Sequence, residues 1–498
     1  MDLEERLTPE QREIVETNKD ILVLAGPGCG KTATLIHKIK RLIEQGKPPE
    51  KILLLSFSLK TSTELKEKIV KAGFKGIRVD TFHGLAYDLW REYHQREPKL
   101  VDERESKLIL KRLFPKDKEA LKDPQKRRIF YDYLEKSGLL DFDTLLLKAS
   151  QIPLSYRGFY IFIDEFQDIS PDMLEFIKSL REATFYLFGD PNQSIYGFRG
   201  VDLRTIKTFL DSYKPNIKLL TLSNSFRCPE EILKVASAFQ CSPWKIEGFR
   251  SLKKGGCVMG YSFDNEKEEA TYLKRSVLNL LGGLGLEQSS HQSISPKDIF
   301  ILARVKRVFE LVHSEFSKEG IPVALPEDKA IQLKGEIFSL VDNLLHNRRS
   351  FEQSLKEASS SLKSLVKNWM ELFDHDYDKM IAHLKKIDLS DLVFPQVEGV
   401  NFLSIHSAKG LEAEVVFLVG AEEGLIPLTL FSDTSFEEER RVLYVALTRT
   451  KRDFYFSAVK GRKVFNRVLD KGLSNWLKDL PHREIKRKAS SVKQTSLF

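Results

Sequence analysis

The chain has 498 residues, of which 42% are hydrophobic and 30% are charged, and its formal net charge is +8. At roughly 150 residues per domain, this length predicts about three domains, which need not be continuous in sequence. No apolar run approaches the roughly 18 residues that a membrane-spanning helix needs, and the first residues lack the basic-then-apolar order of a signal peptide. These features favour a cytoplasmic protein with no membrane partner. The positive charge allows a polyanionic partner without proving one.

The four cysteines, Cys29, Cys228, Cys241 and Cys257, form neither a CxxC pair nor any other metal-ligand spacing. Isolated thiols of this kind are typical of a reducing compartment. We therefore expect no disulfide and no cysteine-bound metal.

The first half of the chain alternates short apolar runs with amphipathic stretches, the pattern of strands and helices in an α/β fold. A helix is predicted near the start, because Thr8 is a typical N-cap and Pro9 suits the first helical position. The predicted strands cover 21–24, 52–58, 161–163 and 185–188, and the predicted helices cover 8–18, 33–45, 61–73 and the part of 79–93 that follows Gly84.

The second half shows a similar organisation with a helical interruption. Residues 299–323 have the pattern of a strand, a helix, a turn and a second strand, and 400–420 return to strands. Between them, 331–393 are helical in pattern, and 94–158 in the first half are likewise short of strand signals. We expect each half to carry a helical insertion. The last predicted helix and strand cover 436–447 and 453–459.

Two apolar runs in the first half each end in a polar cluster. The run 161–163 leads to Asp164 and Glu165, and the run 185–188 leads to Gly189-Asp190 and then Gln193. Apolar runs of this kind are typical of parallel strands buried on both faces, and ligands bind beyond the carboxyl ends of such strands. Both clusters are therefore predicted to face one site.

An aromatic and cationic stretch follows the second cluster. Tyr196, Phe198 and Arg199 lie three to six residues beyond Gln193. Aromatic rings stack on nucleic-acid bases, and a guanidinium pairs with phosphate. One segment is thus predicted to contact two ligands.

A Gly-rich loop lies between the first predicted strand and the helix that follows it. Its residues are Ala25, Gly26, Pro27, Gly28, Cys29, Gly30, Lys31 and Thr32. In a P-loop of this kind, backbone N–H groups surround the β-phosphate, Lys31 neutralises the β- and γ-phosphates and Thr32 holds Mg²⁺. Ala25 replaces the first glycine of the strict pattern, so the string by itself also fits an ordinary Gly-rich turn.

The acidic pair Asp164-Glu165 supplies the second half of such a site. Asp164 would bind Mg²⁺ through water, and Glu165 would act as general base on the attacking water. In isolation, an acidic pair after an apolar strand is also typical of a solvated strand end. Together with the Gly-rich loop it predicts a site for ATP and Mg²⁺.

An ordered set of motifs carries a family resemblance. The motifs are TPEQREIV (8–15), AGPGCGKT (25–32), FSLKTSTEL (57–65), DTFHGLA (80–86), DEFQD (164–168), GDPNQSIYGFRG (189–200), NSFRCPEEIL (224–233), IHSAKGLEAEVVFLVGAEEGLIP (405–427) and EEERRVLYVALTRTK (437–451). In this order they resemble the UvrD/Rep/PcrA family of superfamily 1 DNA helicases, over nearly the whole chain except the two insertions and the tail.

The resemblance implies an α/β fold of two RecA-like P-loop NTPase domains in tandem, each with a mainly helical insertion. It implies an ATP-dependent DNA helicase or single-strand translocase with 3′→5′ polarity, acting in repair or replication. The expected divisions are 1–89 and 151–222 for the first core, 90–150 for its insertion, 223–330 and 396–481 for the second core, 331–395 for a reduced insertion, and 482–498 for a disordered basic tail.

By resemblance, further residues receive roles at the nucleotide. Gln11 would read the adenine, Phe226 would stack on it in place of the usual tyrosine, and Glu412 would contact the ribose. Gln193 would sense the γ-phosphate, and Arg227 and Arg449 would stabilise its charge in the transition state, as arginine fingers do. Chemistry alone also allows both arginines to be surface ions.

The resemblance also implies contacts with single-stranded DNA and with forked or partial duplexes. The residues that match are Phe57, Thr81, His83, Tyr196, Phe198, Arg199, His406 and Lys409. Phe57 equally fits a core position, and the two histidines fit structural roles. RNA is not excluded, because aromatic stacking does not read the sugar.

Both insertions are shorter than is common in the family. Duplex contact and regulation by the second insertion are therefore in doubt, and translocation on a single strand is a safer expectation than processive unwinding. Two alternatives stay open: a translocase that strips proteins from single strands, and a nucleotide-switched, clamp-tethered DNA-binding protein.

The last five residues resemble the peptide that binds bacterial sliding clamps. Gln494, Leu497 and Phe498 match its glutamine and terminal apolar pair, while Thr495 replaces a common leucine. A disordered basic leash with an apolar end suits docking of this kind. A frayed terminus is the alternative.

Overall fold

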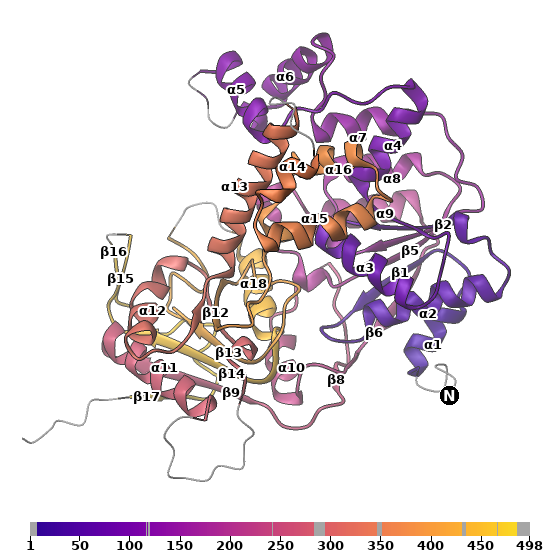
Figure 1. Cartoon of the computed structure of the whole chain (residues 1–498). Coiled ribbons are helices and arrows are strands. Elements are labelled where there is room, and N and C mark those ends of the chain that lie inside the picture. Colours follow the sequence, from indigo (N-terminus) through magenta and orange to yellow (C-terminus); the bar gives the residue numbers. More distant parts are fainter. Residues whose placement is uncertain are drawn as a thin grey trace, which may run out of the picture. The chain divides into compact units, whose positions relative to one another are not determined.

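The computed structural model describes residues 7–115, 117, 120–241, 243–282, 294–345, 351–430, 435–465 and 467–485. The chain forms two compact units. Unit 1 comprises Met1–Asn224, Ser242–Gly248 and Glu327–Val393, and unit 2 comprises Ser225–Cys241, Phe249–Pro326 and Phe394–Phe498. The chain thus returns twice from unit 2 to unit 1, first for a seven-residue segment and then for most of the second helical stretch (Figure 1).

Unit 1 is built on a six-stranded parallel sheet of order β3-β2-β4-β5-β1-β6. The strands are β1 (Ile21–Ala25), β2 (Ile52–Ser56), β3 (Arg78–Thr81), β4 (Tyr160–Asp164), β5 (Thr184–Gly189) and β6 (Lys218–Leu222). Their helices are α1 (Pro9–Glu16), α2 (Lys31–Glu44), α3 (Leu59–Lys71), α4 (Phe82–His94), α8 (Pro171–Ser179) and α9 (Leu203–Tyr213).

The central strands are buried on both faces. Ile21 and Val23 of β1 belong to a core cluster with Leu35 and Ile39 of α2. Leu22 on the opposite face is only 3% exposed. This two-sided burial explains the unbroken apolar runs, and the predicted strands at 21–24, 52–58, 161–163 and 185–188 are confirmed within one or two residues.

The first insertion is helical, as its composition predicts. Its helices are α5 (Glu103–Leu113), α6 (Pro124–Lys136) and α7 (Phe142–Ser150). Phe130 and Leu134 of α6 form a small core with Val101. Helix α7 packs against α4 and α8, which joins this insertion to the main sheet of unit 1.

Unit 2 is built on a seven-stranded parallel sheet of order β11-β12-β10-β13-β14-β9-β17. The strands are β9 (Cys257–Phe263), β10 (Ile299–Ala303), β11 (Val323–Ala324), β12 (Val400–Ser404), β13 (Ala413–Val419), β14 (Thr450–Val459) and β17 (His482–Glu484). The helices are α10 (Glu230–Ser237), α11 (Glu266–Leu280), α12 (Phe309–Lys318) and α18 (Phe436–Leu447). Short strands are β7 (Asn224–Ser225), β8 (Arg250–Ser251), β15 (Arg462–Val464) and β16 (Arg467–Leu469). Two parallel sheets covered by helices confirm the predicted α/β class.

The prediction of a disordered tail over 482–498 is wrong for its first residues. His482–Glu484 forms β17, which pairs in parallel with the edge strand β9, His482 lying opposite Gly260. Composition misses this strand because β9 offers an unpaired edge, which is a tertiary feature.

The cysteines are isolated thiols. Cys29, Cys228 and Cys241 are buried and Cys257 is half-buried. Cys228 and Cys241 contact backbone carbonyl oxygens of Thr448 and Glu437, respectively. In the part of the chain that the structure describes, no helix is both long and apolar enough to cross a membrane.

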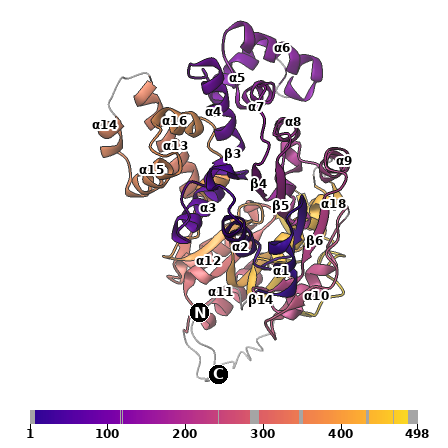
Figure 2. The same ribbon diagram turned by 90° about the vertical axis from the view of Figure 1, so that its right-hand side faces the viewer.

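The second helical insertion groups with unit 1, although unit 2 residues flank it in sequence. It comprises α13 (Pro326–Leu345), α14 (Phe351–Lys356), α15 (Ser360–Leu372), α16 (Tyr377–Leu384) and α17 (Leu389–Leu392). Figure 2 shows α13 to α16 as one group of helices, and α13 contacts α5 of the first insertion, because the Arg104 guanidinium donates to Asp342 (2.9 Å). Helix α15 packs against α3, and α16 packs against α4.

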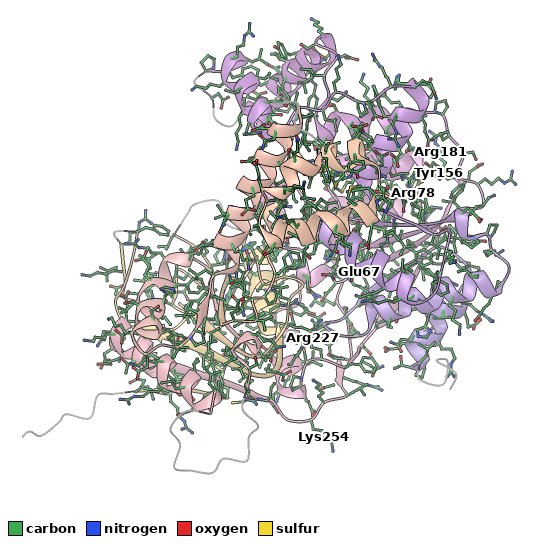
Figure 3. All side chains as sticks on the ribbon, in the orientation of Figure 1. Glu67, Arg78, Tyr156, Arg181, Arg227 and Lys254 are labelled. Atoms are coloured by element: carbon green, nitrogen blue, oxygen red, sulfur yellow. The ribbon has the colours of Figure 1, made fainter. Side chains whose placement is uncertain are left out.

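Buried charges hold α16 on unit 1. The Lys379 ammonium donates to Asp80 (2.6 Å) and Asp88 (2.7 Å), and all three residues are less than 10% exposed. Arg78, labelled in Figure 3, also donates to Asp80 (3.0 Å) and Asp88 (2.5 Å), and it lies at the edge of this buried group. Burial by itself disfavours the Asp80 carboxylate, yet Lys379 and Arg78 together lower its pKa to about 2. The insertion is therefore joined to unit 1 by ion pairs taken out of water.

His383 completes this contact in its neutral form. Its Nδ1 lies 2.8 Å from the carbonyl oxygen of Lys379, which can only accept, so Nδ1 carries the hydrogen. Its Nε2, 3.0 Å from the Thr81 hydroxyl, then accepts, while the Thr81 oxygen accepts from the Gly84 N–H. Burial lowers the pKa of His383 to about 4.

This histidine predicts acid-sensitive docking of the insertion. The unfolded chain binds a proton at His383 below about pH 6.5, whereas the folded chain does so only near pH 4, so folding free energy is lost as pH falls between these values, by up to about 3 kcal/mol. Asp391 acts in the opposite direction, because burial raises its pKa to about 6. As pH is lowered from 7 to 4.5, the midpoint temperature of thermal unfolding should fall less steeply for His383→Gln than for the natural chain. If the midpoints of the two proteins fall in parallel with pH, this prediction is contradicted.

Candidate nucleotide site and nucleic-acid face

The sheet order of unit 1 places the predicted motifs along one edge. Strands β4, β5 and β1 are neighbours, so Asp164-Glu165, Asp190 and the Gly-rich loop all follow adjacent carboxyl ends. Strands β3 and β2 continue the sheet on the other side of β4, and they lead to Thr81 and Phe57. The residues predicted to contact the nucleotide and those predicted to contact DNA therefore follow strands of the same sheet edge.

The Gly-rich loop has the backbone that a phosphate cradle requires. Gly28 and Gly30 have φ values of 68° and 75°, in the left-handed region that glycine adopts without strain. Gly30 is the N-cap of α2, and Lys31 is the first helical residue. The N-terminus of a 14-residue helix with its free N–H groups is a favourable place for anions. Ala25 ends β1 and is buried, so the missing first glycine leaves this geometry intact.

Lys31 is paired with both carboxylates of the acidic motif. Its Nζ lies 2.9 Å from Asp164 Oδ1 and also donates to Glu165 Oε1. Burial by itself lowers the pKa of Lys31, but the two carboxylates outweigh burial and raise it. Burial raises the pKa of Asp164, and Lys31 opposes that rise. The structure thus joins the P-loop lysine to the acidic pair, 133 and 134 residues away.

Glu165 is held in an uncommon backbone conformation. Its φ of 58° is left-handed, which costs a non-glycine residue about 1 kcal/mol or more and persists only when the surroundings enforce it. Gln167 provides one restraint, since its Nε2 donates to Glu165 Oε2 (2.5 Å) and its Oε1 accepts from the Asp190 N–H (3.1 Å). Gln193 donates to Asp190 Oδ2 (2.9 Å). The predicted γ-phosphate sensor is therefore linked to the predicted general base through Asp190 and Gln167.

The residues present fit Mg²⁺ and a nucleotide. Thr32 and Asp164 are oxygen donors at the ends of the Gly-rich loop and of β4, and Mg²⁺ prefers few protein oxygens together with phosphate and water. No group of three or more metal-binding side chains occurs among the described residues. A magnesium ion here would thus take most of its ligands from nucleotide and water.

Gln11 lies in the first turn of α1, where it closes a capping box. Its side-chain oxygen accepts from the Thr8 N–H (3.0 Å), and its own N–H donates to the Thr8 hydroxyl (3.2 Å). The expected N-cap, first-turn proline and glutamine are all confirmed as helix-start residues. The neighbouring Glu10 accepts from Ser223 and Asn224, just before the segment that contains Phe226.

Unit 2 brings its own predicted nucleotide residues together. Arg227, labelled in Figure 3, pairs with Glu412 (2.5 Å), and Lys451 pairs with the other oxygen of that carboxylate (2.6 Å). Phe226 beside them is 44% exposed, as a stacking surface requires. Sequence reasoning missed Lys451, because a lysine two residues after an arginine carries no distinguishing signal.

Arg449 is a buried residue of unit 2 rather than a surface ion. Its side chain is 1% exposed and donates to the carbonyl oxygens of Val445 (2.9 Å) and Leu411 (3.2 Å) and to the Thr448 hydroxyl (3.0 Å). These bonds satisfy a cation that is costly to bury unpaired. They also place it next to the segment that carries Glu412.

The predicted stacking residues of unit 1 form one cluster. The Phe57 and Tyr196 rings stack with centroids 6.0 Å apart, and Phe198 meets Tyr196 edge-on at 6.0 Å. The Arg199 guanidinium lies 4.7 to 5.6 Å from all three ring centroids. Phe198 is 71% exposed, whereas Tyr196 is 8% exposed. The sequence also allowed Phe57 to be a core residue. It is half-buried, so it is only partly a core residue.

The second insertion contacts this cluster with carboxylates. Asp388, the N-cap of α17, pairs with Arg199 (2.6 Å). Asp391 accepts from the Lys60 N–H (3.2 Å) at the start of α3, and the Lys60 ammonium donates to the Val393 carbonyl (2.8 Å). A carboxylate of the chain itself thus pairs with Arg199, one of the residues predicted to contact DNA.

Thr81 and His83 also contact the insertion. Thr81 bonds His383, and the ammonium of Lys386 donates to His83 Nε2 (3.3 Å). Burial, followed by the positive charge of Lys386, lowers the pKa of His83 well below its usual value. His83 meets Phe142 edge-on at 5.5 Å. The structural roles that chemistry alone allowed are therefore realised for both residues.

The remaining predicted residues lie elsewhere. His406 and Lys409 belong to unit 2, in a turn after β12 where the Lys409 N–H donates to the His406 carbonyl (3.2 Å). Gln494, Leu497 and Phe498 lie outside the described residues. Sequence reasoning missed Lys379 and Asp388, because Asp80, Asp88 and Arg199 are far away from them in the chain. It also missed Gln167, for which the position inside DEFQD, two residues after Glu165, offered a signal.

Comparison with known proteins agrees with this arrangement. The family described as "AAA domain" matches residues 11–199, and the family described as "UvrD-like helicase C-terminal domain" matches residues 327–461. The first match covers the Gly-rich loop, the acidic pair and the aromatic cluster. The second covers the insertion, β12 to β14 and Arg449.

Similar proteins are helicases by name. A probable DNA helicase II homolog of Mycoplasma capricolum is 26% identical over 90% of this chain and 83% of its own. The ATP-dependent DNA helicase Rep of Buchnera aphidicola is 24% identical over 96% and 98%, and the ATP-dependent DNA helicase PcrA of Staphylococcus epidermidis is 23% identical over 99% and 89%.

These alignments also show that this chain is shorter than a relative. The alignment with the Buchnera protein runs over 642 positions, more than the 498 residues of this chain, so that relative contains segments which this chain lacks. Two parallel α/β sheets, a P-loop lysine joined to an acidic strand end, and matches to both helicase regions lead to one assignment. Together, the two family regions and the named relatives support a UvrD/Rep/PcrA-like helicase, and the two parallel sheets are consistent with tandem RecA-like P-loop domains.

Proposed function

We propose that this chain is an ATP-dependent DNA helicase or single-strand translocase that couples ATP hydrolysis to movement along DNA. The single observation that carries the proposal is the arrangement along one sheet edge of unit 1. The ion pair of Lys31 with Asp164 and Glu165 lies at this edge, and so does the aromatic cluster around Arg199. Relatives that align with 96% and 99% of this chain are named ATP-dependent DNA helicases.

In this proposal, unit 1 binds the nucleotide and prepares the attacking water. The N–H groups of the Gly-rich loop and Lys31 bind the phosphates, and Thr32 and Asp164 hold Mg²⁺, which would neutralise developing charge on phosphate oxygens. Glu165 takes the proton of the attacking water as general base. For this, Lys31 must exchange the Glu165 carboxylate for phosphate oxygens.

Unit 2 supplies cations for the transition state. Arg227 is a quarter exposed and Arg449 is fully buried, so Arg227 reaches phosphate more readily and Arg449 requires its carbonyl partners to rearrange. Phe226 stacks on the adenine, while Gln11 reads its edge. Glu412 contacts the ribose after releasing Arg227 or Lys451.

Movement along DNA would use the cluster that follows β5. Bases stack on Phe57, Tyr196 and Phe198, each with a contribution of roughly 1–3 kcal/mol. The nucleotide contact Gln193 is three residues from Tyr196, so a shift at the phosphate reaches the DNA within one short segment. We propose 3′→5′ polarity, a role in repair or replication, and tethering to a sliding clamp through the tail.

Replacement of Asp388 by asparagine is expected to strengthen binding of single-stranded DNA. Arg199 would then lose a carboxylate partner that competes with phosphate. An ion pair of this exposure is worth up to about 1 kcal/mol, so the dissociation constant for a labelled oligothymidine should fall about two- to fivefold at low salt.

The matched variant is Arg199→Ala, which should weaken binding. It should also reduce the slope of log K against log salt by about 0.7, because one phosphate contact on a single strand is lost. Weaker binding by Asp388→Asn would contradict the prediction and indicate that Asp388 orients Arg199 for DNA.

The proposed function is tested by ATP hydrolysis rates with single-stranded DNA, duplex DNA and RNA side by side. We expect strong stimulation by single-stranded DNA. An unstimulated or very slow rate with tight, nucleotide-dependent DNA binding would favour the nucleotide-switched alternative. A forked duplex separates unwinding from translocation alone, and recovery on a sliding clamp with and without the last five residues tests the tail.

A further inference from the structure

One short segment of unit 1 contributes none of the proposed nucleotide or DNA contacts. Residues Ser242–Gly248 belong to unit 1, whereas the residues directly before and after them belong to unit 2. Within this strap, Trp244 and Ile246 are buried, at 8% and 2% exposure, and Lys245 and Glu247 are exposed. The side chains of residues 244–247 thus alternate between buried and exposed, as in an extended segment with one side covered.

Trp244 contacts the acidic motif. Its ring meets Phe166 edge-on, with centroids 5.6 Å apart at 85°, a favourable aromatic geometry. Phe166 is the residue after Glu165 and is fully buried. A residue of the strap therefore contacts the turn that carries the proposed general base.

Phe166 is confined on its other sides. A Cβ added at Gly189 would lie 2.7 Å from Phe166 Cδ1 and 2.1 Å from Gln167 Oε1, so the turn is pressed against the end of β5. Phe166 also lines a cavity of about 10 Å³, together with apolar side chains such as Leu187 and Phe209. Trp244 therefore contacts a ring that borders both the end of β5 and a small apolar cavity.

The turn needs such a restraint because Glu165 is strained. Its left-handed backbone is followed by a tight turn in which the Asp168 N–H donates to the Glu165 carbonyl (2.9 Å) and the Ile169 N–H to the Phe166 carbonyl (3.3 Å). A conformation of this kind relaxes when its packing is removed. Relaxation would turn the Glu165 carboxylate away from its present direction toward Lys31 and Gln167.

We propose that Trp244 is a positioning residue, which holds Phe166 against the end of β5 and so maintains Glu165 in its working conformation. The residues before and after the strap belong to unit 2. The effect of Trp244 on catalysis rests on the proposed ATP hydrolysis. The packing of Trp244 against Phe166 and its effect on the turn do not depend on that proposal.

Trp244→Ala is compared with Trp244→Phe, which keeps an aromatic edge, and with Lys245→Ala, an exposed neighbour in the same strap. With saturating single-stranded DNA, kcat for ATP should fall about tenfold or more in Trp244→Ala, while KM for ATP changes less than about twofold, because the P-loop is untouched. Trp244→Phe should recover most of the rate, and Lys245→Ala should match the natural chain. Circular dichroism and binding of a fluorescent ATP analogue establish that each variant is folded.

Hydrogen exchange gives a readout that needs no activity. The Asp168 and Ile169 amides should exchange at least about tenfold faster in Trp244→Ala than in Lys245→Ala. Unchanged exchange, unchanged kcat in folded Trp244→Ala, or a loss of kcat matched by an equal loss of nucleotide binding would overturn the inference. An inactive natural chain would refute the proposed function, and the exchange rates would still decide whether Trp244 holds the turn.

Discussion

Replacing Lys31 with alanine is expected to reduce DNA-stimulated ATP hydrolysis by about 100- to 1000-fold, the loss typical when one preorganised electrostatic contact is removed from a transition state. Lys31 is the first residue of α2, and its ammonium already lies between the carboxylates of Asp164 and Glu165. Without it, two acidic groups would face the phosphates with no lysine between them. Both nucleotide affinity and turnover should therefore fall.

Glu165→Gln should separate chemistry from binding. Glutamine keeps the shape and removes the base, so kcat should fall about 100- to 10,000-fold while ATP binding is retained or strengthened. The measurements are steady-state hydrolysis and binding of a fluorescent ATP analogue. The matched control is Lys40→Ala on α2, where Lys40 pairs with Glu44 (3.4 Å), and it should be unaffected. Turnover by either site variant near the natural rate would refute the site assignment.

Replacing Lys379 with methionine is expected to release the second insertion from unit 1. The change leaves two buried carboxylates, Asp80 and Asp88, with only the partly exposed guanidinium groups of Arg78 and Arg91 as cations. Removing one partner of a buried ion pair typically costs about 3–5 kcal/mol. The remaining arginines place the expected loss at about 3 kcal/mol. Hydrogen exchange of α15 and α16 measures this loss locally, which is appropriate because a chain of two units need not unfold in one step.

The controls for this prediction separate the buried pair from a general loss of charge. Lys367→Ala removes an exposed lysine of α15 and should leave exchange unchanged. Lys379→Met combined with Asp88→Asn should be less damaging than the sum of the two single changes, because the uncompensated carboxylate is gone. Strict additivity, or slow exchange in Lys379→Met, would show that apolar packing rather than the ion pairs holds the insertion.

Several parts of the fold follow from local sequence. The unbroken apolar runs predicted buried parallel strands, and Thr8, Pro9 and Gln11 predicted the start of α1. The order of the motifs predicted that Asp164 and Glu165 approach Lys31, because parallel strands expose their carboxyl ends at one edge. Each of these features depends on residues a few positions apart or on the regular geometry of a parallel sheet.

Other parts depended on packing between distant segments. The helical pattern of 331–393 predicted an insertion, but not that its carboxylates pair with Arg199 or that Lys379 bridges Asp80 and Asp88. The strand His482–Glu484 exists because β9 has a free edge. Trp244 was indistinguishable in sequence from any other aromatic residue in a short linker.

The sequence by itself determined the chemistry of this protein: a Gly-rich loop, an acidic pair and an arginine-tipped aromatic segment, each encoded within a few consecutive residues. Only the tertiary structure decided what surrounds them. It placed the Asp388 carboxylate of the insertion on Arg199, a proposed DNA contact, the neutral His383 on Thr81, and Trp244 on Phe166. These contacts join residues up to 302 positions apart, and their formation depends on burial and charge in the folded chain, which no local pattern records.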